Sequence, residues 1–229
     1  MYPECKIAEM DRIYRINNIL EKEYHSPRHG NKSNPVDEVI YIILSQRTNE
    51  KCYQRNFREL KRRFKNMEDI PQSSAPRVAR VIYRGGMSDI KAPRIISAMK
   101  KIKKDFGTIS LDELREWSEE DALNYLRKLP GIGEKSAYCI MMYSLGFRVF
   151  PADVHTIRIC NRLGLINEKS NHKKAQKLLA RVIPEDIRYS FHVNLVAHGR
   201  KICRENNPLC SRCSIKRYCK YVKNGKKEA

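Results

Sequence analysis

The sequence of 229 residues has no apolar run long enough to cross a bilayer, and its first residues, MYPECKIAEM, lack the basic-then-apolar layout of a signal peptide. Repeats of solenoid period and long low-complexity linkers are also missing. These absences exclude a membrane-spanning chain and a repeat protein. We therefore expect a soluble, cytoplasmic protein with no signal or transit peptide.

Acidic residues are scarce relative to basic ones. The chain has 26 Asp and Glu against 46 Lys and Arg, which leaves a formal net charge of +20. The basic residues are spread over the chain, for example at 61–63, 100–104 and 173–174, and do not form one juxtamembrane cluster. A charge of this size and spread predicts a polyanionic partner, and nucleic acid fits best.

Strand-like alternation of apolar and polar residues is absent too, whereas apolar residues recur at helical spacing along most of the chain, as in 13–20, 52–64 and 95–106. The fold class is therefore predicted to be all-α. Residues 36–44, VDEVIYIIL, are apolar on nearly every face after Val39, which predicts a helix in the middle of a bundle. The length allows one or two hydrophobic cores.

The stretch KLPGIGEKSAY, residues 128–138, separates two short helical patterns by a proline and two glycines. This is a helix-hairpin-helix pattern near 122–145. Gly131 and Gly133 allow positive φ and a close approach of another backbone, and the unpaired amides at the start of the second helix can bind phosphate. A tight turn whose glycines only permit packing is the alternative.

Lys135 falls in the first turn of the second helix, where the positive end of the helix dipole disfavours an ammonium group. A lysine whose pKa is lowered in this way can act as a nucleophile and form a Schiff base, although a plain phosphate contact is the alternative. Asp153, in FPADVH, stands at the expected N-cap of a later helix. Backbone amides there would keep its carboxylate ionised and suited to stabilise a developing cation.

Four of the eight cysteines have the spacing CX6CX2CX5C and are candidate ligands of one metal centre: Cys203, Cys210, Cys213 and Cys219. A reducing compartment makes a disulfide framework an unnatural interpretation. Structural zinc favours paired CXXC knuckles, and only one such pair is present. The asymmetry therefore suits an iron–sulfur cluster somewhat better than zinc.

Taken together, LPGIGEKSA, Asp153 and the cysteine spacing resemble the endonuclease III family of the helix-hairpin-helix DNA glycosylase superfamily over nearly the whole chain. The resemblance implies a six-helix barrel domain at 35–146 and an iron–sulfur cluster domain built from 1–34 and 147–229. It also implies one 4Fe-4S cluster on the four cysteines and an active site in the cleft between the two helical domains.

For function, the resemblance implies a bifunctional DNA N-glycosylase and DNA-(apurinic or apyrimidinic site) lyase of base excision repair. Lys135 matches the Schiff-base nucleophile of the family and Asp153 its essential carboxylate. The enzyme would excise oxidised pyrimidines and nick the strand 3′ to the abasic site by β-elimination. The expected partner is double-stranded DNA with a damaged base or abasic site, held in part by Gly131, Ile132 and Gly133, and the enzyme is expected to be monomeric and nucleoid-associated.

One loop departs from the family pattern. LSQRTNE, residues 44–50, replaces the family's LSAQATD-like segment and is as similar to the corresponding segment of plant 5-methylcytosine glycosylases. Gln46 or Arg47 is the candidate for the residue that fills the gap left by a flipped base. Two alternatives follow: a glycosylase for a modified or mismatched base such as 5-methylcytosine, uracil or mismatched thymine, and a non-catalytic, zinc-containing DNA-binding protein.

Overall fold

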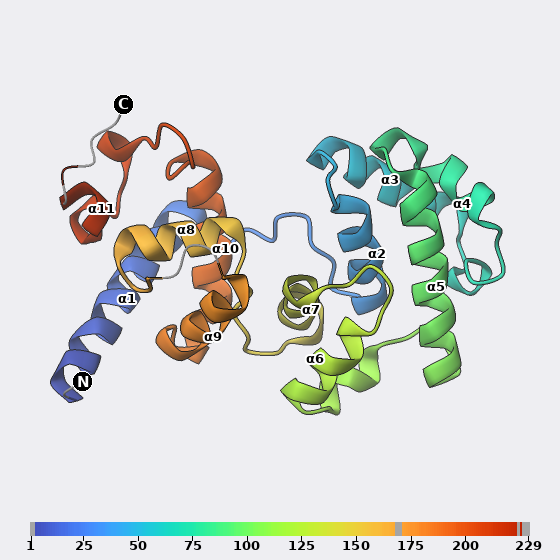
Figure 1. Ribbon diagram of the computed structural model, residues 1–229, viewed down its shortest axis with the longest axis horizontal. Helices are drawn as coiled ribbons and strands as arrows, with labels where there is room; N and C mark the ends of the chain where they lie inside the picture. Colours follow the sequence, from blue (N-terminus) through green and yellow to red (C-terminus); the bar gives the residue numbers. More distant parts are fainter. Residues whose placement is uncertain (1–2, 168–170, 224, 226–229) are drawn as a thin grey trace. The chain divides into compact units, whose positions relative to one another are not determined.

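The computed structural model describes residues 3–167, 171–223 and 225, with residues 3–6 described by their backbone alone. Every regular element within these ranges is helical, which confirms the all-α prediction (Figure 1). No helix of the described residues combines the length and apolar character that a bilayer crossing requires.

The helices are α1 (Pro3–Tyr24), α2 (Pro35–Ser45), α3 (Glu50–Arg63), α4 (Ala75–Ile82), α5 (Ser88–Phe106), α6 (Glu119–Arg127), α7 (Glu134–Ile140), α8 (Val154–Leu163), α9 (His172–Val182), α10 (Arg188–Lys201) and α11 (Lys220–Lys223). Short 3-10 turns join some of them: η1 (Met67–Asp69), η2 (Tyr83–Gly85), η3 (Asp112–Glu116), η5 (Glu185–Ile187), η6 (Cys210–Arg212) and η7 (Lys216–Tyr218). A π-turn, η4 (Met141–Leu145), extends α7.

The chain divides into two compact units. The first combines Met1–His29 with Arg148–Ala229, and the second is Gly30–Phe147. The second unit contains α2 to α7, and the first contains α1 and α8 to α11.

The helix α2 lies at the centre of the second unit, as the apolar run 36–44 predicts. Its start is fixed by Asn34, whose side chain accepts a hydrogen bond of 3.0 Å from the backbone N–H of Asp37, and by Pro35 in the first turn. It packs against α3, α5 and α7 (Figure 1), and its apolar residues from Val36 to Leu44 are all buried. Burial of each such side chain contributes roughly 1.5–3 kcal/mol, so α2 anchors this unit.

The core of the first unit forms where α1 and α8 pack against α10. Its members include the fully buried Ile13, Ile16 and Leu20 of α1, at helical spacing, together with Phe150 and Phe191. This packing holds the start of α8 and the end of α10, the two places that carry Asp153 and the first of the four clustered cysteines in the sequence.

Candidate functional site

The turn between α6 and α7 is closed by its own backbone. The N–H of Ile132 donates to the carbonyl of Leu129 at 3.0 Å, and both side chains are buried. Gly131 adopts the left-handed conformation with φ of +86°, whereas Gly133 caps α7 in an extended conformation with φ of −91°. Only one of the two glycines therefore uses the positive φ that the sequence allows, and the amide of Ile132 is already engaged within the turn.

The two glycines also face different surroundings. A Cβ at Gly131 would lie 3.1 Å from Cδ of Arg94 and 3.4 Å from Cγ1 of Ile43, so this residue is packed against α5 and α2. A Cβ at Gly133 would meet no atom within 4 Å among the described residues, and Gly133 is exposed. No side chain caps α7 at this position, so the amides of its first turn have no capping side chain to bond to.

Gln46 and Arg47 lie in the loop between α2 and α3 and differ in how they are held. The side-chain amide of Gln46 donates to the carbonyl of Gly131 at 2.7 Å, and its oxygen accepts from Arg94 at 3.2 Å. Arg47 is exposed and has a left-handed backbone with φ of +50°. The fold thus ties Gln46 to the hairpin turn and leaves the Arg47 side chain on the surface.

Lys135 is an exposed residue of the first turn of α7, and a buried acid, Glu38 of α2, lies near it. Burial raises the pKa of Glu38 to about 7, while hydrogen bonds from the backbone of Lys32, at 2.6 Å, and from the side chain of Asn31 act in the opposite direction. The positive charges of Lys32 and Lys135 also lower this pKa. Glu38 is therefore a buried carboxyl group that senses the charge of Lys135.

Sequence reasoning missed Glu38, although a signal was available. Glu38 precedes the apolar run and lies on one helix face with Tyr41 and Ile42, the residues three and four positions later, and both are buried. An acidic residue on an apolar helix face is costly unless it is hydrogen-bonded or protonated. Such a residue is a candidate for a functional role.

Asp153 caps α8, as its position in the sequence predicts. Its carboxylate accepts from the N–H of Thr156 at 2.7 Å, and the hydroxyl of Thr156 accepts from the N–H of Asp153 at 2.9 Å, which completes a capping box. This pairing fixes the side chain at the positive end of α8. Asp153 belongs to the first unit and Lys135 to the second.

The four cysteines of the CX6CX2CX5C segment follow α10 and are joined by the turns η6 and η7. Cys203 accepts a hydrogen bond from Nη1 of Arg162 at 3.2 Å, and the thiol of Cys219 donates to the carbonyl of Arg162 at 3.3 Å. The sulfur of Cys213 lies 3.4 Å from Nε2 of His198. Thus Arg162, from α8, connects the first and last of the four cysteines.

The pKa of the Cys213 thiol is raised to about 12, mainly by burial. The backbone of Ile215 lowers this pKa, and the nearby Cys203, Cys219 and Cys210 raise it. The three other cysteines therefore lie close enough to Cys213 to affect its pKa. Within the described residues, however, no three His, Cys, Asp or Glu side chains converge closely enough to hold a single metal ion. The donor set is purely sulfur, which suits soft metals and iron–sulfur clusters.

Comparisons with known proteins agree with this architecture. Residues 40–185, more than half of the chain, match the family described as the HhH-GPD superfamily base excision DNA repair protein. A curated relative, endonuclease III of Thermotoga maritima, is 28% identical over 203 residues, which cover 88% of this chain and 91% of the relative.

Among solved structures, a trapped covalent intermediate of endonuclease III with DNA has a TM-score of 0.80 at 20% identity and covers 95% of this chain and 99% of its own. A thermostable thymine-DNA glycosylase has a TM-score of 0.77 at 20% identity, with 93% and 98% covered. At this identity the two structures support the two-domain helical fold. From the family match and the fold together, the chain belongs to the HhH-GPD superfamily of base excision DNA repair proteins.

Proposed function

We propose that this protein is a bifunctional DNA glycosylase and AP lyase that acts on damaged pyrimidines in double-stranded DNA. The observation that carries the proposal is Lys135, an exposed lysine in the first turn of α7, two residues after the exposed Gly133, in a chain of a base excision repair family. A phosphate bound at the backbone amides of the first turn of α7 would hold the sugar of the lesion strand beside the Lys135 amine.

In the proposed reaction the lesion base is flipped out of the duplex. The neutral amine of Lys135 then forms a bond to C1′ of the deoxyribose as the bond from C1′ to the base breaks, and the base leaves with a proton. Asp153 stabilises the positive charge that develops on the sugar and accepts the proton released by the lysine nitrogen. The joint action of Lys135 and Asp153 on one sugar is part of this proposal.

The C1′–O4′ bond of the sugar ring then breaks and O4′ takes up the proton held by Asp153. The protonated imine left between Lys135 and C1′ makes the 2′ proton acidic. Loss of that proton and expulsion of the 3′ phosphate break the strand by β-elimination, and hydrolysis of the imine returns the lysine. This second step separates a lyase from a glycosylase that lacks a lysine nucleophile, since only an amine can hold the sugar as an imine.

Arg47 is the better supported of the two gap-filling candidates. The side-chain amide of Gln46 donates a hydrogen bond to Gly131 and accepts one from Arg94. Both hydrogen bonds would have to break before Gln46 could enter a duplex. Arg47 is exposed, and a guanidinium group can occupy the space of a base and contact the orphaned partner base. Gln46 in this proposal supports the hairpin turn.

We also propose that Cys203, Cys210, Cys213 and Cys219 hold one 4Fe-4S cluster. The supporting observations are the all-sulfur donor set and the neighbourhood of the four thiols around Cys213. Such a cluster would bind each of the four thiolates through a different iron ion. The cluster would supply structural order to the segment after α10.

A panel of duplexes tests the activity. Single duplexes containing thymine glycol, dihydrouracil, uracil, 5-methylcytosine, mismatched thymine or 8-oxoguanine are scored separately for base release and for strand nicking. The proposal expects release and nicking together on the oxidised pyrimidines. Release from 5-methylcytosine or mismatched thymine alone would assign a different substrate, and neither release nor nicking on any duplex would overturn the proposal.

Elemental analysis of anaerobically purified protein tests the cluster. We expect about four iron ions per chain and matching acid-labile sulfide. The Cys210→Ser variant should lose most of the iron, whereas Cys160→Ser, a change at a buried thiol of α8 outside the segment, should keep it. Zinc in place of iron would contradict the cluster and favour a structural zinc site.

A further inference from the structure

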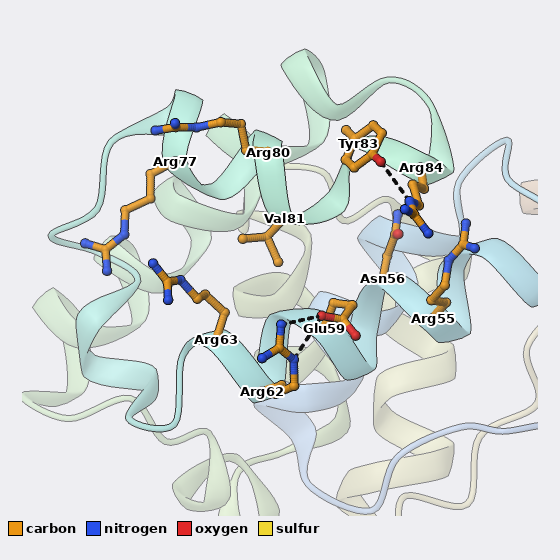
Figure 2. Close-up of a pocket in the computed structure, with 10 residues that line it drawn as sticks. All are labelled: Arg55, Asn56, Glu59, Arg62, Arg63, Arg77, Arg80, Val81, Tyr83 and Arg84. Atoms are coloured by element: carbon orange, nitrogen blue, oxygen red, sulfur yellow. Dashed lines mark hydrogen bonds and ion pairs between the residues drawn. The ribbon is translucent and has the colours of Figure 1, made fainter.

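A hollow of about 680 Å³ on the second unit is lined mainly by arginine (Figure 2). Its walls come from α3, α4 and η2. Six of its lining residues are arginines: Arg55, Arg62, Arg63, Arg77, Arg80 and Arg84. The single carboxylate is Glu59, so six positive charges face one negative charge, a formal balance of +5. No role in the proposed reaction uses any of these residues.

The positive charge of the hollow is only weakly compensated from within. Glu59 pairs with Arg62 at 2.9 Å, but the two side chains are 45% and 74% exposed, so water screens the pair. Arg63, Arg77 and Arg80 form no ion pair with any part of the chain that the structure describes, and Nε of Arg55 is shielded from solvent there without a hydrogen-bond partner. Like charges gathered in one concavity repel, and a bound polyanion relieves the repulsion.

The type and placement of the cations indicate phosphate groups arranged along a chain. Every cation is an arginine, whose planar fork matches a phosphate in two hydrogen bonds, and lysine is absent from the lining. Figure 2 shows Arg63 and Arg77 toward one end of the hollow and Arg55 and Arg84 toward the other. A single small anion would engage one end only, whereas a strand with regularly spaced phosphates can engage both.

An exposed aromatic ring at the same hollow favours a nucleic acid over an acidic peptide. The side chain of Tyr83 is 58% exposed, and the guanidinium group of Arg84 lies 5.5 Å from its ring centre and donates to its hydroxyl at 2.8 Å. An aromatic face beside cations is the pairing that binds a base or sugar together with its phosphate. An acidic peptide has no need of the exposed ring.

The hollow is also joined to the loop that carries Arg47. The hydroxyl of Thr48 donates to the carbonyl of Gly85 at 2.8 Å, and Nδ2 of Asn56 donates to the carbonyl of Ile82 at 2.7 Å. The first bond fastens η2, with Tyr83 and Arg84, to the loop between α2 and α3, and the second joins α3 to the last residue of α4. The arginine hollow therefore adjoins the loop that carries Arg47.

We propose that the arginine hollow binds the sugar–phosphate backbone of the DNA flanking the lesion, as a second contact distinct from the hairpin. This proposal rests on the proposed function only because it takes DNA as the ligand of the arginine hollow. The contact contributes affinity and salt dependence and does not enter the chemistry at Lys135.

The test uses the full chain and a triple variant, Arg63→Gln, Arg77→Gln and Arg80→Gln, at three exposed positions. A matched control, Lys173→Gln, Lys174→Gln and Lys177→Gln, removes the same charge from exposed positions of α9 in the other unit. A second variant, Arg63→Lys, Arg77→Lys and Arg80→Lys, keeps the positive charge at these three positions. Fluorescence anisotropy measures binding to a long undamaged duplex over a range of salt concentrations, after circular dichroism has verified that each variant is folded.

The proposal expects the glutamine variant at the hollow to bind the long duplex roughly a hundredfold more weakly at about 0.1 M salt, with a log–log salt slope smaller by about 2–3. The α9 control and the lysine variant should keep most of the slope. Equal slopes in the hollow variant and the α9 control would overturn the proposal. Loss of binding to polyglutamate with unchanged DNA binding would also overturn it, in favour of an acidic protein partner.

Covalent trapping on a short abasic duplex separates this proposal from the proposed function. The hollow variant should trap as wild type does at saturating protein, because the arginines do not touch the reacting sugar. Absence of trapping in wild type together with the expected change in salt slope would reject the lyase and retain the second DNA contact.

Discussion

Gly131 and Gly133 share one turn, but they are held by different physical constraints. Gly131 combines a φ of +86° with close neighbours, so an alanine there suffers both backbone strain and contact with Arg94. We expect Gly131→Ala to lower the free energy of unfolding by about 1–3 kcal/mol. Gly133→Ala should change it by less than about 0.5 kcal/mol, because its φ of −91° and open surroundings accept a methyl group.

The Gly133→Ala variant should instead weaken DNA binding several-fold, since the added methyl group occupies the space through which a phosphate approaches the amides of α7. Urea unfolding and duplex binding of both variants check the pair. Unchanged affinity in Gly133→Ala would argue that this face of the turn does not contact DNA.

The buried carboxyl group of Glu38 should make the free energy of unfolding depend on pH. Its pKa is about 7 in the folded protein against an ordinary value of 4.5, so the folded state holds a proton that the unfolded state releases between these values. Stability from this group is therefore fully present below pH 4.5 and is lost as the pH rises toward 7, by about 3 kcal/mol. The Glu38→Gln variant cannot ionise and should lack this decline.

The measurement is the free energy of unfolding in urea at about pH 5 and about pH 8 for both proteins. The change between the two pH values is compared, because the amide of the variant alters the hydrogen bonds with Asn31 and Lys32 at both pH values alike. A wild-type decline no larger than that of Glu38→Gln would show that the carboxyl group ionises in the folded state as easily as in water.

At the residue scale, the sequence predicts a side chain best when one local interaction decides its place. Asp153 was predicted as an N-cap because capping depends on neighbours within one turn. The bonds of Gln46 to Gly131 and Arg94, and the burial of Glu38, depend on segments far away in the chain. The sequence pattern alone contains no distance between such segments, so these contacts required the structure.

At the scale of one helix, α8 allows capping and catalysis to be separated. Asn is as good an N-cap as Asp, so Asp153→Asn should keep the free energy of unfolding within about 0.5 kcal/mol, whereas Asp153→Ala should lose about 1 kcal/mol. If the negative charge serves the reaction, both variants should reduce base release by about 100-fold or more. Urea unfolding and single-turnover kinetics check the two effects.

Near wild-type base release in Asp153→Asn, with normal stability, would reduce Asp153 to a structural cap. The opposite result, a loss of activity only in Asp153→Ala, would tie the defect to the position of α8 and not to the charge.

Helices were predictable from the sequence where a hydrophobic pattern sets them. The run 36–44 is apolar on nearly every face, so a helix there is buried whichever elements pack around it. In the structure α2 packs against α3, α5 and α7. The backbone of the hairpin turn was less predictable. A glycine permits positive φ without requiring it, and the sequence does not indicate which of Gly131 and Gly133 adopts it.

At the scale of the whole molecule, the formal charge of +20 should appear in DNA binding as counterion release. We expect affinity for an undamaged duplex to fall roughly a thousandfold between about 50 and 200 mM salt. Anisotropy titrations at several salt concentrations measure the slope. A flat response would mean that the basic residues, including those of the arginine hollow, do not face the DNA.

The central claim is that Lys135 is the nucleophile, and reduction of the imine in place tests it most directly. Wild-type protein is incubated with an abasic duplex and borohydride, and the covalent protein–DNA complex is resolved on a denaturing gel and mapped by mass spectrometry. The account predicts a trapped complex on Lys135 that disappears in Lys135→Ala and persists in Lys128→Ala, a lysine on the other side of the same turn. Trapping that survives in Lys135→Ala, or a failure of the wild type to trap, would contradict it.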